Sequence, residues 1–272
     1  MMPSNEPTEV QRRVALQQTL YRSRNATRRY LHATRRAWVE EQIARASTAN
    51  GGASNFALEL GPGSGIYLSA LGQVAQTVLA VDIDFDMLHA AREAVDDPQI
   101  SGSGREGFST TGFIAADICR SPLADASIDL ILCSEVIEHV EDSEAVLTAM
   151  VRLLKPDGRL ILTTPQPLSP LEILGKVAFL PGIIHLLRAL YREPIEPTGH
   201  INVLSRRALE QQMRRAGLCV EQRASCGFYL PIIAEFGGSA GANFLRWCDR
   251  HLRNSPLSPL QWTQCYVLKQ QA

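Results

Sequence analysis

Lysine is scarce in this chain, and the cysteine patterns of metal sites are missing. Three of the 27 basic residues are lysine, and a formal net charge of −1 gives no general excess of positive charge for nucleic acid. The six cysteines form no C-x-x-C pair and no cysteine–histidine spacing typical of zinc. We therefore expect no nucleic-acid partner, and buried thiols in a reducing compartment.

Long apolar runs are also missing. The most apolar stretch, residues 171–191, is interrupted by Lys176 and divided by Pro181-Gly182, so it is too short to span a membrane. The chain begins with MMPSNEPTEV, which lacks the apolar segment of a signal peptide. These absences favour a cytoplasmic protein, with peripheral contact to a membrane surface as an additional expectation.

Strand and helix patterns alternate from about residue 55 onward. Apolar runs predict strands at Phe56–Leu60, Val78–Asp82, Gly112–Ala116, Ile128–Cys133, Arg159–Thr164, Leu218–Glu221 and Trp262–Leu268. Helices are predicted at Ile66–Val74, Met87–Val95, Ser143–Leu154 and 206–216, and across residues 228–262. Near-continuous apolar strands separated by helices indicate a parallel sheet covered on both faces.

Two regions depart from this alternation. Residues 10–47 carry an Arg-rich pattern that suits a helix, and residues 165–200 hold six prolines around the apolar stretch. We expect residues 1–50 to form an N-terminal helical lid. Residues 51–272 would form one α/β domain, with a helical cap inserted at about 165–200.

Three glycines at alternate positions, Gly61, Gly63 and Gly65, stand between the first predicted strand and the first predicted helix. Glycine lets the backbone approach a ligand closely, and the first amides of the helix then face an anionic group. The spacing G-x-G-x-G, with Glu59 two residues upstream, differs from the G-x-G-x-x-G of dinucleotide-binding loops. The loop alone would suit several nucleotide-like ligands.

Polar residues follow the next three predicted strands as well. Asp82 ends the second strand, where a carboxylate can accept hydrogen bonds from two ribose hydroxyls. Asp117 follows the third strand, and the block from Ser134 to His139 follows the fourth. All these pieces fall at the carboxyl ends of strands, where open α/β sheets bind their ligands.

With these motifs the chain resembles the class I S-adenosylmethionine-dependent methyltransferases, especially the branch that includes ubiquinone and menaquinone biosynthesis methyltransferases. The resemblance covers about residues 55–165, with a weaker match at 199–209. It rests on E-L-G-P-G-S-G (59–65), V-D-I-D-F-D-M-L (81–88), A-D-I (116–118), S-I-D-L-I-L-C-S-E-V-I-E-H-V (127–140) and L-L-K-P-D-G-R-L-I-L-T-T-P (153–165). It implies a Rossmann-like sheet of seven strands in the order 3-2-1-4-5-7-6, with the last strand antiparallel.

The resemblance also implies which residues hold the methionine part of S-adenosylmethionine. The three glycines would let it lie on the loop, and Glu59 would face its ammonium group. Ser134 would lie near the same part of the cofactor and near the entrance for the substrate.

Four further residues would hold the adenosine part. Asp82 would accept from the ribose hydroxyls, and Asp117 from the adenine amino group. Ile83 and Ile118 would cover the two faces of the adenine ring.

The acceptor side is less specific. His139, His200 and Glu135 are candidate catalytic residues, because a histidine near the acceptor could remove its proton. Glu135, Glu138 and His139 could share one helix face. Two alternatives stay open: Glu138 and His139 form a structural pair, or all three residues bind a divalent cation. We predict no metal. Tyr21 and Tyr30 of the lid are candidate substrate contacts, with simple packing as the alternative.

We therefore predict methyl transfer from S-adenosylmethionine to an oxygen or carbon atom of a hydrophobic small molecule, such as a quinone-, polyketide- or lipid-like metabolite. The apolar cap is the feature that favours a hydrophobic acceptor. Two alternatives remain open: a catalytically silent protein of the same fold, and a nicotinamide-dependent oxidoreductase. A nucleic-acid methyltransferase is disfavoured because C-S-E-V stands where an N-P-P-Y-like block would follow the fourth strand.

Overall fold

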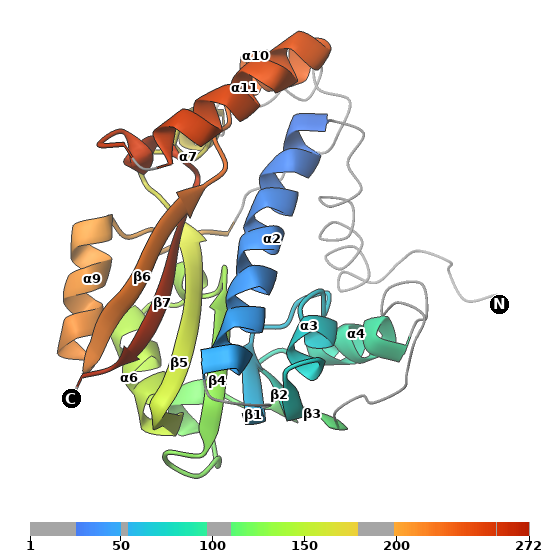
Figure 1. Cartoon of the computed structure of the whole chain (residues 1–272), viewed down its shortest axis with the longest axis vertical. Helices are drawn as coiled ribbons and strands as arrows, with labels where there is room; N and C mark the ends of the chain where they lie inside the picture. The colour runs from blue at the N-terminus through green and yellow to red at the C-terminus, as the bar shows by residue number, and fades with distance from the viewer. Residues whose placement is uncertain (1–25, 50–53, 97–109, 179–198, 254, 272) are drawn as a thin grey trace, which may run out of the picture.

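The computed structural model describes residues 26–49, 54–96, 110–178, 199–253 and 255–271. One sheet of seven strands has the order β3-β2-β1-β4-β5-β7-β6 (Figure 1). The first five strands pair in parallel, and β7 runs antiparallel to both β5 and β6. The predicted strand order and the antiparallel last strand are confirmed. The strands are β1 Ser54–Leu60, β2 Ala75–Asp82, β3 Thr110–Ala115, β4 Ile128–Ser134, β5 Leu154–Pro165, β6 Leu218–Cys226 and β7 Thr263–Gln270.

β5 and β6 exceed their predicted lengths by the largest margin. β5 begins at Leu154, before the K-P-D-G turn signal, because Leu154 pairs with Ile128 across an irregularity in the ladder. β6 continues to Cys226, because it remains paired with β7 up to Thr263. Pairing with a neighbouring strand decides these ends, and local residue preference does not reveal it.

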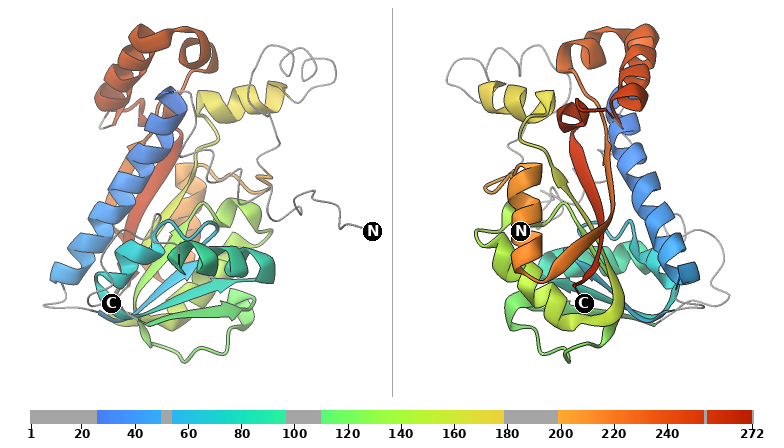
Figure 2. Two further views of the ribbon diagram at one scale, coloured as in Figure 1. Left: turned by 90° about the vertical axis from the view of Figure 1, so that its right-hand side faces the viewer. Right: turned by 60° about the vertical axis from the view of Figure 1, so that its left-hand side comes forward.

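Helices cover both faces of the sheet. α2 (Ala26–Ala49), α3 (Leu68–Gly72) and α4 (Phe85–Asp96) pack on one face, and α6 (Ser143–Leu153) and α9 (Arg206–Arg215) pack on the other (Figures 1 and 2). Ser205 caps α9 as predicted, by accepting a hydrogen bond from the backbone of Ala208. α3 is shorter than the predicted helix, because residues 63–67 form a turn.

The two faces have separate apolar cores. Val39 and Ile43 of α2 are buried against the sheet with Val78 of β2. Leu147 and Met150 of α6 are buried on the opposite face. Complete burial of each such side chain contributes about 1.5–3 kcal/mol, so both helical layers hold the strand ends firmly in place.

A third apolar cluster lies beyond the carboxyl end of β5. It joins α2 to α10 (Pro231–Phe236) and α11 (Gly238–Leu252), next to α7 (Pro170–Ala178) (Figure 2). Buried Asp249 of α11 accepts hydrogen bonds from the Tyr30 hydroxyl at 2.9 Å, the Gln261 side chain and the Gly227 amide. This carboxylate therefore connects α2 with the C-terminal part of the chain. The predicted lid is described only from residue 26, and the predicted domain boundaries stay predictions.

The cysteines are only partly as expected. All six are free thiols, and Cys226 and Cys265 lie buried on paired strands with their sulfur atoms 3.8 Å apart. Cys119 is exposed, so the expectation of six buried thiols is wrong. It lies on η1 (Ile118–Arg120), a short turn outside the sheet, where no second layer covers it.

Within the described ranges, no helix combines the length and the apolar character needed to cross a membrane.

Candidate active site

The strand ends that carry the predicted motifs lie in register. Leu60 of β1 pairs with Val81 of β2 on one side and with Cys133 of β4 on the other. Ser134, the last residue of β4, pairs with Thr163 of β5. The sheet therefore brings the separate motifs to one edge, as their places at strand ends predict.

The glycine loop needs its glycines for two reasons. Gly61, Gly63 and Gly65 all have positive φ, at +65°, +54° and +71°, where other residues are strained. A Cβ on Gly61 would meet a methyl carbon of Val136 at 2.6 Å, and one on Gly65 would meet the carbonyl oxygen of Ala91 at 3.0 Å. The loop thus packs closely against its neighbours, and no side chain covers the backbone at its glycines.

Glu59 is buried just before this loop, with 2% of its surface exposed. Its Oε2 atom has no hydrogen-bond partner among the described residues. Burial raises the pKa of this carboxyl to about 8. A buried carboxyl group without a partner is costly, so this position fits a ligand that brings a positive charge.

Four residues predicted to hold adenosine lie at or just after the ends of β2 and β3. Asp82 ends β2 and accepts a hydrogen bond from the Asp84 amide at 2.9 Å. Ile83, directly after β2, is 78% exposed, which is unusual for isoleucine. Ile118, which follows β3, is buried. Asp117 is exposed and caps η1 by accepting from the Cys119 amide. These four residues lie where the sequence predicts them, and their roles toward a ligand stay predictions.

Glu135 lies in a different place from the one predicted. It has a positive φ of +58° and turns toward α2, where its carboxylate forms an ion pair with Arg35 at 2.7 Å. Thr163 donates a hydrogen bond to the same carboxylate and lies 2.9 Å from the hydroxyl of Ser134. A non-glycine residue in this backbone conformation is strained, a feature that concentrates at functional sites.

Glu138 and His139 follow on η2 (Ile137–His139) and point in other directions. The predicted shared helix face with Glu135 is therefore wrong, because a short 3₁₀ turn stands where a helix was expected. Glu138 is fully buried and accepts from the Thr164 hydroxyl at 3.0 Å. Burial, and secondly the charge of Glu135, raise the pKa of Glu138 well above its ordinary value.

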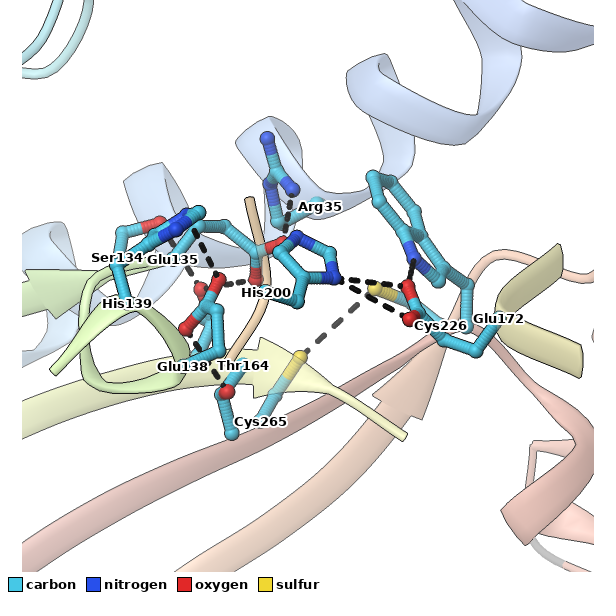
Figure 3. Close-up of polar contacts among 12 residues, drawn as sticks. Arg35, Ser134, Glu135, Glu138, His139, Thr164, Glu172, His200, Cys226 and Cys265 are labelled. Carbon is cyan, nitrogen blue, oxygen red and sulfur yellow. Dashed lines mark hydrogen bonds and ion pairs between the residues drawn. The ribbon is translucent and has the colours of Figure 1, made fainter. Parts of the chain in front are cut away.

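The two candidate histidines lie side by side. The rings of His139 and His200 are 5.2 Å apart, although 60 residues separate His139 from Gly199 (Figure 3). His139 Nδ1 lies 3.1 Å from the carbonyl oxygen of Gly199. The backbone amides of Ile201 and Asn202 both donate to the carbonyl oxygen of Glu138, which holds this loop against η2.

The residues that could bind a cation differ from the predicted set. Glu138, His139 and His200 each offer one ligand atom, and these atoms lie within 4.8 Å of one another. Such a group could hold a metal ion. Glu135 is not part of it, because its carboxylate is engaged by Arg35.

Three residues around His200 were not predicted. His200 Nδ1 lies 3.2 Å from the carboxylate of Glu172 (Figure 3). The indole of Trp262 donates to that carboxylate at 3.3 Å. The guanidinium group of Arg35 lies 5.2 Å from the centre of the Trp262 ring. Glu172 looks like an ordinary acidic residue in a first helical turn, and Arg35 is one of many arginines in α2, so neither stood out in the sequence.

Of the two tyrosines predicted to contact the substrate, only Tyr30 lies in a described range. Tyr21 lies outside the described residues. The Tyr30 hydroxyl binds Asp249 and the guanidinium of Arg246 lies over its ring, so its described contacts join α2 to α11. Its contact with a substrate stays a prediction.

Known proteins are similar to this chain in sequence over part of its length. The sequence model of a family described as "Methyltransferase domain" matches residues 58–162, from β1 into β5. An uncharacterized methyltransferase of Mycobacterium bovis is 34% identical over 113 residues, which are 42% of this chain and 40% of that protein. A ubiquinone biosynthesis O-methyltransferase of Methylococcus capsulatus is 28% identical over 198 residues, which are 71% of this chain and 76% of that protein.

Solved structures share the fold. The N-methyltransferase NodS from Bradyrhizobium japonicum, in complex with S-adenosyl-L-homocysteine, superposes with a TM-score of 0.54 over 96% of both chains. The two sequences are 16% identical, so this likeness concerns the fold alone.

Proposed function

We propose that this protein is a class I S-adenosylmethionine-dependent methyltransferase that transfers a methyl group to an oxygen or carbon atom of a hydrophobic small molecule. The match of residues 58–162 to a methyltransferase domain supports this proposal. The observation that carries the proposal is Glu59. A buried carboxyl group with an unpartnered oxygen, directly before a glycine loop, is the arrangement that an ammonium-bearing ligand would complete.

The other residues of this edge suit the rest of the cofactor. Asp82 would hold the ribose hydroxyls, Asp117 would accept from the adenine amino group, and the exposed side chain of Ile83 would lie against the ring. When bound, S-adenosylmethionine supplies a methyl group that is already activated by its positive sulfur. The protein then has to align donor and acceptor, and such alignment can lower a barrier by about 7–11 kcal/mol.

Two observations support a hydrophobic acceptor. Ile173 and Leu174 of α7 and the preceding Leu168 are more than 40% exposed, beside the loop that carries His200. The Methylococcus capsulatus relative is named for O-methylation in ubiquinone biosynthesis. A quinone-like acceptor and peripheral contact with a membrane are therefore part of the proposal, and flotation of the protein with lipid vesicles tests the contact.

Isothermal titration calorimetry tests the cofactor. We expect S-adenosylmethionine and S-adenosylhomocysteine to bind, and Asp82→Ala to weaken both by at least about 10-fold, because a hydrogen-bonded carboxylate is lost. Asp157→Ala, at an exposed position of β5, is the matched control and should leave binding unchanged. Binding of a nicotinamide dinucleotide in place of S-adenosylmethionine would favour the oxidoreductase alternative. Cofactor binding without turnover on any extract would favour the silent protein.

A further inference from the structure

We propose that Glu172 and His200 form a carboxylate–imidazole dyad that removes the proton of the acceptor hydroxyl during methyl transfer. His200 is the catalytic base in this proposal, and Glu172 is the positioning residue. The inference rests on the proposed methyl transfer and specifies the acceptor as a hydroxyl group.

The geometry of the pair fixes the imidazole. His200 Nδ1 lies 3.2 Å from both carboxylate oxygens of Glu172, and the two side chains are 10% and 7% exposed. An ionised carboxylate only accepts hydrogen bonds, so Nδ1 must carry the hydrogen and Nε2 keeps the lone pair. The pair therefore selects the tautomer that can accept a proton at Nε2.

Glu172 is itself held from two sides. The indole Nε1 of Trp262 donates to its Oε1 atom, and its own amide donates to the hydroxyl of Ser169 at 3.3 Å. The edge of the His32 ring packs on Trp262, with the ring centres 5.3 Å apart. Glu172 also lies in the first turn of α7, where the helix favours negative charge. The carboxylate is thus held by α7 and by Trp262, the residue before β7, and Trp262 in turn packs on His32 of α2.

His139 lacks this arrangement. Its Nδ1 atom faces the neutral carbonyl of Gly199, and its side chain is 42% exposed. The carboxylate of buried Glu138 lies 3.9 Å from its Nε2 atom, which is beyond hydrogen-bond distance. A carboxylate stabilises an imidazolium more strongly than a carbonyl does, because the hydrogen bond joins two charged groups. His200 is therefore the better base of the two, with the His139 ring as its neighbour.

The reaction balances without a further reactant. The acceptor oxygen forms a bond to the methyl carbon while the carbon–sulfur bond breaks, and that electron pair stays on sulfur. The hydroxyl proton moves to Nε2 of His200. The negative charge of Glu172 stabilises the imidazolium until the proton passes to water.

Kinetics with a defined acceptor tests the dyad. The probe is 2-prenylphenol, which offers one hydroxyl and an apolar chain, with label from the methyl group of S-adenosylmethionine. We expect His200→Ala to lower kcat by about 100-fold or more and added imidazole to restore part of it. Glu172→Gln should lower kcat by about 10- to 100-fold, with the KM for S-adenosylmethionine unchanged. Glu144→Gln, which breaks an exposed ion pair with Arg215, is the control and should retain full activity.

Nitrogen-15 NMR of the imidazoles gives a readout that does not depend on turnover. The His200 signals, identified by their loss in His200→Ala, should show the Nδ1–H tautomer in the wild type and a mixture of tautomers in Glu172→Gln. Unchanged tautomers in Glu172→Gln, or a wild-type kcat in that variant, would overturn the dyad. So would loss of activity on chelation that Mn²⁺ or Zn²⁺ restores, because the histidines would then act as ligands.

Failure of the proposed function looks different. A wild-type protein that binds neither S-adenosylmethionine nor S-adenosylhomocysteine is no methyltransferase, whatever the state of His200. A protein that binds them and leaves 2-prenylphenol unmethylated contradicts the hydroxyl assignment alone.

Discussion

The cofactor edge of the sheet and the group of residues around His200 are built in different ways. At the cofactor edge, contacts are local: Asp82 accepts from a residue two positions later, and Asp117 does the same. Around His200, the partners are distant in sequence. Trp262 and Glu172 are 90 residues apart, and Tyr30 and Asp249, which join α2 to α11, are 219 residues apart.

Because of this difference, we expect substitutions in the two regions to affect different properties of the protein. The aspartates of the cofactor edge form hydrogen bonds within their own loops, so changes at this edge should affect the cofactor. The group around His200 depends on α2, α7 and the segment at Trp262 remaining packed together, so changes there should affect stability and the acceptor. Three variants test this separation.

The largest effect is expected at Gly61. Gly61→Val would place a branched side chain at a φ of +65° and at 2.6 Å from a methyl carbon of Val136. The strained conformation alone costs about 1–2 kcal/mol, and the overlap must move the loop. We expect binding of S-adenosylhomocysteine to fall by at least about 100-fold in calorimetry, since the backbone can no longer approach the ligand.

The control for this variant is Gly175→Ala. Gly175 lies in α7, with open space where a Cβ would stand. Alanine in a helix is more stable than glycine by about 1 kcal/mol, so this variant should bind the cofactor normally and melt no lower than the wild type. If Gly61→Val binds the cofactor as the wild type does, the glycine loop is not part of the site.

A smaller effect, mainly on stability, is expected at Arg35. Arg35→Gln leaves the carboxylate of Glu135 without its ion-pair partner, close to the buried Glu138. Breaking a buried pair costs about 3–5 kcal/mol, and we expect a value at the lower end because the Glu135 side chain is still 17% exposed. Urea unfolding measures this loss. Cofactor affinity should change less than about 3-fold.

Two comparisons complete this test. Arg45→Gln breaks an exposed ion pair on the same helix and should cost no more than about 0.5 kcal/mol. The double variant Arg35→Gln with Glu135→Gln removes both charges and should recover part of the loss, because no unpaired carboxylate remains. Equal losses in Arg35→Gln and Arg45→Gln would show that the Arg35–Glu135 pair does not hold α2 on the sheet.

The sequence predicted the cofactor edge better than the group of residues around His200. The strand order and the positions of Glu59, Gly61 and Asp82 were predictable, because hydrophobic periodicity places the strands and short motifs follow their ends. Cys119 was expected to be buried and is exposed, because the sequence does not show which turns a second layer covers.

The surroundings of the histidines were only half predictable. His139 and His200 could be chosen by residue type, but the acidic partner of His200 could not. The sequence pointed to Glu135 and Glu138, which stand close to His139 in the chain. The structure supplies Glu172 from α7 and directs Glu135 to Arg35, and both pairings depend on long-range packing that no local pattern contains.

The smallest effect is the contribution of Glu59 to the pH dependence of the free energy of unfolding. Burial raises the pKa of Glu59 to about 8 in the folded protein, against about 4.3 in the unfolded chain. Between these values the unfolded chain has lost this proton and the folded protein keeps it. The unfolded state therefore binds fewer protons, and this group lowers the free energy of unfolding by about 1.4 kcal/mol for each unit of rising pH. Urea unfolding at about pH 5.5 and about pH 7.5 should show that slope in the wild type and its loss in Glu59→Gln.

The same carboxyl links pH to the cofactor. An ammonium group beside Glu59 favours the ionised form, so binding near neutral pH should release about one proton, measured by calorimetry in buffers of different ionisation enthalpy. Glu59→Gln should release none and bind more weakly, while Glu93→Gln on the exposed surface of α4 should behave as the wild type. Proton release that persists in Glu59→Gln would mean that another group meets the ammonium. The cofactor edge would then depend on more than the local motifs at its strand ends.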